Sequence, residues 1–167
     1  ELNNVAFRRD GRVEAQCGLD PVGFKNVPAE NGMLLAVDKA NRLIKFYNES
    51  ADLPLAINYS TEHMYDERAN ALKDFKLNLE DDFLPRLGYL AVGDKFTTNC
   101  LAYEGTLEAL NTALDAIATT PLYGGISDSG AIAISTTKPT AGPVLKVIQK
   151  TTMPDTQLGV KFQVLAD

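Results

Sequence analysis

The strongest structural signal in the sequence is a strict alternation of apolar and polar side chains over residues 160–164. Val160, Phe162 and Val164 alternate with Lys161 and Gln163. Side chains two residues apart share one face of a β-strand, so this pattern predicts a strand with one buried and one exposed face. Other apolar runs are also short and end at Gly, Pro, Asn or Asp, which favours a fold built from many short strands.

A hairpin is predicted in the first half of the chain. Two apolar runs, residues 33–37 and 42–47, flank a polar connection of four residues, 38–41. This arrangement is typical of two antiparallel strands joined by a short loop. A third run over residues 53–59 carries Pro54 near its start, where a strand tolerates proline best, so we expect a strand after the proline.

A turn at Gly93 and Asp94 divides the stretch from residue 84 to residue 103 into two predicted strands. Glycine supplies the backbone angles of a tight turn, and an aspartate side chain can accept a hydrogen bond within it. Additional strands are predicted at residues 75–79, 131–135 and 144–150.

A single amphipathic helix is predicted near residues 106–118. Its apolar residues recur at steps of three, four and three, with Thr106 as a suitable N-cap and Pro121 beyond its end. We expect these apolar side chains to form one buried stripe: Leu107, Leu110, Leu114 and Ile117.

The predicted fold class is mainly β (α+β), as a β-sandwich or barrel-like module of short antiparallel strands with this one helix. Residues 33–167 are expected to form a single β-rich domain. Residues 1–32 are rich in turn-forming residues and are interpreted as an extended arm. Two alternatives remain for that segment: short strands packed on their own domain, or an arm lying on a neighbouring subunit.

Charge and hydropathy argue against two kinds of partner. The chain has 167 residues with 16 Lys and Arg against 22 Asp and Glu, a net charge of −6. An acidic balance disfavours a protein that mainly neutralises phosphates, so no nucleic-acid partner is expected. Apolar runs fall short of the roughly 18–20 residues that a membrane-spanning helix needs, so no membrane association is expected.

The only histidine, His63, gives the best candidate for catalysis. Glu62 or Asp66 could orient it as a general base or join it in a metal site. A zinc or iron site normally requires more imidazole or thiolate groups, so a surface or capping histidine is the favoured interpretation. Ser127 and Ser129 lie outside a GxSxG pattern, which leaves a serine hydrolase without its nucleophile turn.

Cys17 and Cys100 stand far apart without CxxC spacing, which favours free thiols in a reducing compartment, although their pairing is left open. Cys100 could pair with His63 in catalysis, but it falls in a predicted strand, where a thiol is usually inert. The acidic group at residues 80–82 lacks the spacing of an EF-hand and indicates a solvated turn. Hence no catalytic, cofactor-binding or metal-ligating residue is assigned, and a non-enzyme is expected.

A small basic group is formed by Arg8, Arg9 and Arg12. Given the acidic character of the whole chain, an acidic protein surface is a better partner for it than DNA.

Two segments, FLPRLGYLAVGDKFTTNCLAY (residues 83–103) and GPVLKVIQKTTMPDTQLGVKFQVLAD (residues 142–167), resemble decoration or cement proteins of tailed-bacteriophage heads. The resemblance extends to the predicted hairpin and the residues after it. It implies a β-rich, non-catalytic virion protein that forms homo-oligomers, dimers or trimers, and binds the major capsid protein on the outside of the shell. No site residue follows from the resemblance.

Two alternatives come from other classes of protein. The first is a carbohydrate- or receptor-binding β module of a fibre or an extracellular protein, which would depend on exposed tyrosines. The second is a small hydrolase that uses His63 and the carboxylates near it. Substitution of His63 by alanine would abolish activity only in the second case.

Overall fold

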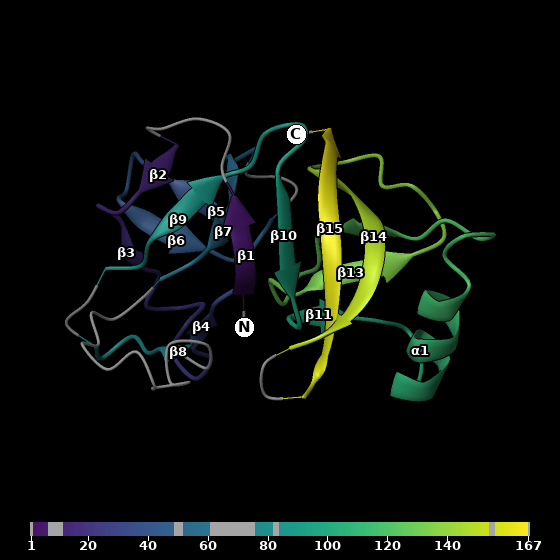
Figure 1. Cartoon of the computed structure of the whole chain (residues 1–167). Coiled ribbons are helices and arrows are strands. Elements are labelled where there is room, and N and C mark those ends of the chain that lie inside the picture. Colours follow the sequence, from purple (N-terminus) through teal and green to yellow (C-terminus); the bar gives the residue numbers. More distant parts are fainter. Residues whose placement is uncertain are drawn as a thin grey trace.

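A computed structural model describes residues 2–6, 12–48, 52–60, 76–81, 84–153 and 156–166. Their main feature is a pair of β-sheets that lie side by side, with one helix at the far side of the larger sheet (Figure 1). The larger sheet, sheet A, has the strand order β1-β10-β15-β14-β12-β13-β11. The bounds of its strands are Leu2–Ala6 (β1), Lys95–Thr98 (β10), Leu101–Ala102 (β11), Tyr123–Gly125 (β12), Ile132–Ser135 (β13), Val144–Thr152 (β14) and Leu158–Ala166 (β15).

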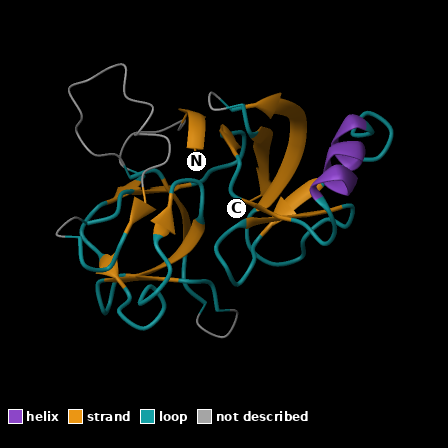
Figure 2. Ribbon diagram, turned by 90° about the horizontal axis from the view of Figure 1, so that it is seen from below, coloured by secondary structure: helices purple, strands orange, loops and turns teal. Residues whose placement is uncertain are grey.

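The second sheet, sheet B, has the strand order β2-β9-β7-β5-β6-β3. Its strands are Val13–Glu14 (β2), Gly18–Leu19 (β3), Leu34–Asp38 (β5), Leu43–Lys45 (β6), Leu55–Asn58 (β7) and Leu87–Tyr89 (β9). A small third sheet pairs β4 (Ala29–Glu30) with β8 (Lys76–Leu77). Seen from below, sheet B and sheet A with its helix form two adjoining lobes (Figure 2).

The predicted hairpin is confirmed by the antiparallel pairing of β5 with β6. Its connection is held by Asp38, whose carboxylate accepts hydrogen bonds from the backbone N–H of Asn41 at 3.1 Å, from the side-chain amide of Asn41 at 2.8 Å and from Lys45 Nζ at 2.7 Å. These bonds hold the pKa of Asp38 below its ordinary value, with the Asn41 side chain as the largest cause. β7 begins directly after Pro54, as predicted.

The predicted turn before β10 is also confirmed, and both of its residues act as expected. Gly93 has φ = 92°, a left-handed backbone conformation that favours glycine. Asp94 Oδ2 accepts a hydrogen bond from the backbone N–H of Ala91 at 2.9 Å. The turn therefore leads the chain from β9 of sheet B into β10 of sheet A.

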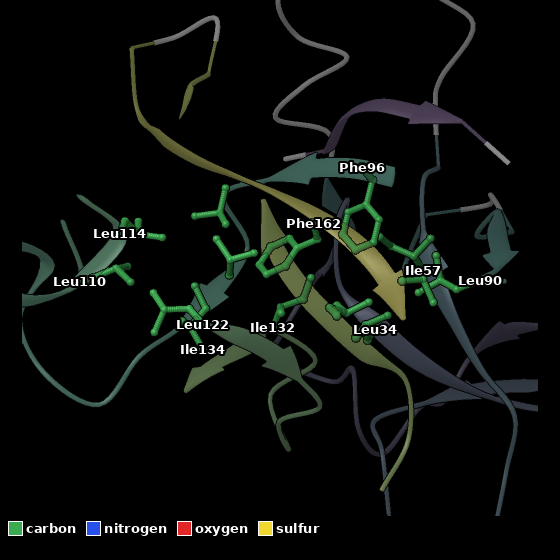
Figure 3. Close-up of a cluster of buried hydrophobic side chains, with 14 residues drawn as sticks. Leu34, Ile57, Leu90, Phe96, Leu110, Leu114, Leu122, Ile132, Ile134 and Phe162 are labelled. Atoms are coloured by element: carbon green, nitrogen blue, oxygen red, sulfur yellow. The ribbon is translucent and has the colours of Figure 1, made fainter. Parts of the chain in front are cut away.

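A hydrophobic core lies between the two sheets and the helix (Figure 3). Leu34 and Ile57 of sheet B contribute to it together with Phe96 and Phe162 of sheet A. The two phenylalanine rings lie 5.6 Å apart between centroids, in a tilted arrangement that aromatic pairs favour. The predicted one-faced strand is confirmed, since Val160, Phe162 and Val164 are all buried.

A second core covers the other face of sheet B. Leu35 and Val37 of β5 pack there with Phe24, Ile44 and Leu77. Adjacent residues of a strand point to opposite faces, so Leu34 and Leu35 enter different cores. Sheet B is consequently an internal layer with apolar side chains on both faces.

The helix, α1 (Leu107–Asp115), begins as predicted, with the Thr106 side chain accepting a hydrogen bond from the N–H of Ala109 at 3.2 Å. Leu110 and Leu114 are buried, and Ile117 packs partly buried against the same core. The predicted continuous buried stripe is wrong at Leu107, whose side chain is 66 % exposed. The first turn of α1 extends beyond the core, so its apolar residue meets solvent.

The mainly β fold class with one helix is confirmed, and most strand pairs are antiparallel. Two pairs are parallel, β3 with β6 and β11 with β13, which the expectation of antiparallel strands missed. Parallel neighbours require a crossover connection, and the chain between β11 and β13 supplies one that contains α1 and β12.

The described part of the segment 1–32 packs on its own chain. β1 pairs with β10 at the edge of sheet A, while β2 and β3 form the two edges of sheet B. Cys17, Leu19, Phe24 and Ala29 are buried in the second core. Residues 12–32 therefore form short strands and loops that pack on their own chain, as in the first of the two alternatives.

Candidate functional site

The catalytic candidates from the sequence do not assemble in the described part of the chain. His63, Glu62 and Asp66 lie outside the described residues. Ser127 donates a hydrogen bond to the backbone oxygen of Ala131 at 2.6 Å, and its hydroxyl lies 3.0 Å from that of Ser129. These contacts close a loop. Within the described ranges, no three His, Cys, Asp or Glu side chains gather as a metal site would require.

The two cysteines are unpaired thiols. Cys17 is buried in the second core, and Cys100 packs at the edge of the same core. Burial raises the pKa of Cys100 to about 11, and burial together with the nearby Glu14 raises the pKa of Cys17. Both thiols are thus protonated at neutral pH, a state in which cysteine is a poor nucleophile.

Asp81 of the acidic group forms a turn, as expected. Its carboxylate accepts a hydrogen bond from the backbone N–H of Asn78 at 2.6 Å, and its own N–H donates to the Asn78 backbone oxygen at 3.1 Å. Asp82 lies outside the described residues.

Arg12 makes an internal ion pair, which corrects its expected role in binding an external acidic surface. Its Nη1 lies 2.7 Å from Asp94 Oδ2, and its Nη2 lies 3.2 Å from Asp94 Oδ1. Nη1 also donates to the backbone oxygen of Tyr89 at 2.8 Å. Asp94 is only 2 % exposed. The ion pair joins the chain entering β2 of sheet B to the turn that opens β10 of sheet A. Arg8 and Arg9 lie outside the described residues.

An open groove of about 790 Å³ lies between α1 and the end of the β14–β15 hairpin. Its apolar floor includes Leu110 and Leu158. Polar groups surround this floor, namely the side chains of Asn99, Asn111, Lys150, Thr151, Thr152, Thr156 and Gln157. Lys150 Nζ is held by Asp115 at 2.8 Å, and Asn99 donates to Gln157 at 2.9 Å. Such a lining offers amide and hydroxyl hydrogen bonds with little free charge.

The outer face of sheet A is the second notable surface. The pairing register aligns Lys95, Gln163 and Lys146 across β10, β15 and β14, and Lys161 lies two residues from Gln163 on the same face. Lys95 and Lys146 are exposed, and Lys161 is half-buried. We call these three lysines the lysine face.

The sequence pattern indicated only part of this surface. The alternation over residues 160–164 correctly placed Lys161 on the exposed side of its strand. Lys95 and Lys146 join it by pairing with Gln163, which is 68 positions from Lys95 and 17 from Lys146, and local periodicity does not specify such pairing. Only a correct prediction of the strand register would have placed the three lysines on one face.

No described helix has the length and apolar character of a membrane-spanning segment. Comparison with known proteins returned no relative: no protein-family model matches this chain, and no curated protein and no solved structure matches it either.

Proposed function

We propose that this chain is a non-enzymatic structural protein of a phage virion, which binds the outer surface of the capsid lattice and stabilises it as a decoration protein. Its partners are then the major capsid protein and further copies of itself, without nucleic acid or membrane. The support for this proposal comes from the segments that resemble decoration proteins and from how they are placed in the fold.

One observation carries the proposal. The two resembling segments, residues 83–103 and 142–167, are separated by almost 40 residues, yet they supply β10, β15 and β14, which are adjacent strands of sheet A. The first segment also supplies β9 of sheet B and β11 at the far edge of sheet A. A large part of the likeness therefore falls on three neighbouring strands of one sheet. A continuous rigid sheet face is well suited to contact a regular lattice, where many weak contacts add up through multivalency.

Fractionation of source material on a density gradient tests this function. We expect quantitative mass spectrometry of the nuclease-resistant particle band to find this chain in hundreds of copies beside a larger shell protein. Recovery of the chain among the free proteins at the top of the gradient would contradict the proposal.

The groove beside α1 supports a second candidate, a carbohydrate-binding module. Neutral sugars are bound by hydrogen bonds from amides and hydroxyls, and the groove presents Asn111, Gln157 and three threonines over an apolar floor. None of the described residues that line the groove is aromatic, so the stacking on tyrosine that the sequence had indicated is not seen among them.

A glycan array with two matched variants distinguishes this candidate. Gln157→Ala alters the groove, whereas Gln149→Ala removes an exposed glutamine from β14 outside the groove. We expect sugar binding to weaken only in the first variant. Equal loss in both, or no binding by the native chain to any glycan, contradicts a carbohydrate site in this groove.

A further inference from the structure

The lysines of the lysine face differ from several other lysines of the chain in that no carboxylate of the described residues pairs with them. Lys39, Lys45, Lys76 and Lys150 each form an ion pair with a carboxylate of the same chain. Among the described residues, Lys95, Lys146 and Lys161 have no such ion pair. In the pairing register their neighbours on the same face are uncharged, with Gln163 between Lys95 and Lys146, and Gln149 beside Lys161.

This cationic surface belongs to an acidic protein. Three of the 16 cationic side chains of the chain lie on the lysine face, although the whole chain carries a net charge of −6. The remaining surface is therefore more acidic than the net charge alone indicates. A like-charged group of three lysines held on one rigid sheet attracts an acidic surface and repels a basic one.

Acidic side chains gather beyond the opposite edge of the same sheet. Glu104 follows β11, the last strand of sheet A, and Glu108 lies in the first turn of α1. Glu104 and Ser127 line one pocket, so Asp128 lies near the same edge. These three carboxylates are exposed and have no ion pair within the described part of the chain. We call them the acidic edge.

The described residues of these two surfaces do not pair with each other within one chain. In sheet A, the strands β12 and β13 separate the lysine-bearing strand β14 from the edge strand β11. Among the described residues, no ion pair joins Glu104, Glu108 or Asp128 to Lys95, Lys146 or Lys161. The acidic edge of a second molecule can supply carboxylates to the lysine face.

We propose that the lysine face is a subunit contact, and that its occupant is the acidic edge of a second copy of this chain. The lysine face and the acidic edge are different surfaces of one molecule, so the contact is head-to-tail. Each contact places three ammonium groups against three carboxylates. The proposal does not depend on the proposed function, because it concerns the purified protein alone.

Sedimentation equilibrium at low and high salt gives the first test. At about 50 mM NaCl we expect the native chain to self-associate at micromolar concentrations, and at about 500 mM NaCl we expect the association constant to fall at least about tenfold, since salt screens exposed charges. A native chain that stays monomeric at about 100 μM in low salt would overturn the proposal.

Charge reversal on the lysine face gives the second test. Lys95→Glu with Lys146→Glu is expected to abolish self-association at low salt, because it places like charges against the acidic edge. The matched control is Lys25→Glu with Lys138→Glu, which changes the net charge equally at two exposed lysines elsewhere. Equal weakening in both variants would overturn the proposal, because it would show an effect of net charge only.

A charge swap separates loss of the contact from loss of folding. The chain that carries Lys95→Glu and Lys146→Glu together with Glu104→Lys and Glu108→Lys is expected to recover self-association, since the two surfaces are again complementary. Circular dichroism and thermal unfolding of every variant verify that each one is folded. A folded, fully swapped chain that remains monomeric while the native chain associates would show that other residues form the contact.

Discussion

In β15, buried and half-buried side chains alternate over residues 160–164, whereas every residue of β5 is buried. Val160, Phe162 and Val164 point into the core between the sheets, and Lys161 and Gln163 point outward. Along β5, Leu34 enters that same core and Leu35 enters the second core on the other face of sheet B. Leu34 of β5 and Phe162 of β15 pack in the same core. The second core covers the other face of β5, whereas among the described residues no second core covers the other face of β15.

The surfaces that can contact a partner follow from how each sheet is covered. The central strands of sheet B are covered on both faces by the same chain, so these faces hold the fold together. Sheet A has its inner face on the core, and its outer face is exposed at Lys95 and Lys146 and half-exposed at Lys161, although Thr97 on the same face is buried. Antiparallel sheets commonly have one such solvated face. The lysine face and the groove beside α1 both belong to sheet A, so the surfaces available to a partner gather on the one-faced sheet.

The largest effect is expected in β15 from Phe162→Ala. The Phe162 side chain is completely buried, so its loss leaves a cavity, and we expect the free energy of unfolding to fall by about 3–5 kcal/mol. Gln163→Ala on the outer face is the control and should cost under about 1 kcal/mol. Urea unfolding measures both. A cost below about 1 kcal/mol for Phe162→Ala would contradict the one-faced burial of β15.

For β5 we expect two adjacent substitutions to be equally damaging. Leu34→Ala and Leu35→Ala should each lower the free energy of unfolding by about 2–5 kcal/mol, because each empties space in a different core. Urea unfolding of the two variants checks this. If one of the two substitutions leaves the free energy of unfolding nearly unchanged, then one face of β5 is not buried and β5 does not differ from β15.

The ion pair between Arg12 and Asp94 joins the two sheets. Its removal tests whether a buried ion pair contributes more to stability than an exposed one. Asp94→Asn keeps the shape of the side chain but removes its charge, so we expect a loss of about 1–3 kcal/mol. Asp115→Asn breaks the more exposed pair with Lys150 and should cost under about 1 kcal/mol. Thermal unfolding monitored by circular dichroism compares them. Equal losses would show that burial does not strengthen the link between sheets.

The smallest effect concerns pH and the end of β5. Because the pKa of Asp38 is lowered by folding, its ionised form stabilises the folded protein above the ordinary pKa of about 3.9, and this contribution is lost as the pH falls. We expect the stability difference between the native chain and Asp38→Asn to shrink from pH 5 to pH 2. Urea unfolding at several pH values measures it, and a difference that is constant with pH would contradict the hydrogen bonds of Asp38.

Local patterns predicted the elements whose signals are local. The hairpin at β5 and β6, the strand after Pro54, the Gly93–Asp94 turn and the Thr106 cap each depend on residues close in sequence, and all four are present. The parallel pair β11–β13 was missed, because pairing partners are chosen by packing across the whole chain. Leu107 fitted the helical period but lies beyond the core, so periodicity alone could not show that it is exposed.

The same limit applies to the candidate site. Arg12 was identified as part of a basic group, but its partner Asp94 is 82 positions away in the chain. The lysine face combines residues from two segments that meet only through strand pairing. Charge on a single residue is visible in a sequence, whereas the charge of a surface depends on which strands are neighbours.

Local patterns were enough to predict a mainly β chain with short strands, one capped helix and a turn at Gly93, because backbone preferences and side-chain period act over a few residues. The identity of neighbouring strands, the exposed face of each sheet and the pairing of charges became visible only in the folded chain. These depend on burial of apolar area shared by distant segments, a property of the assembled sheets and not of any one of their strands.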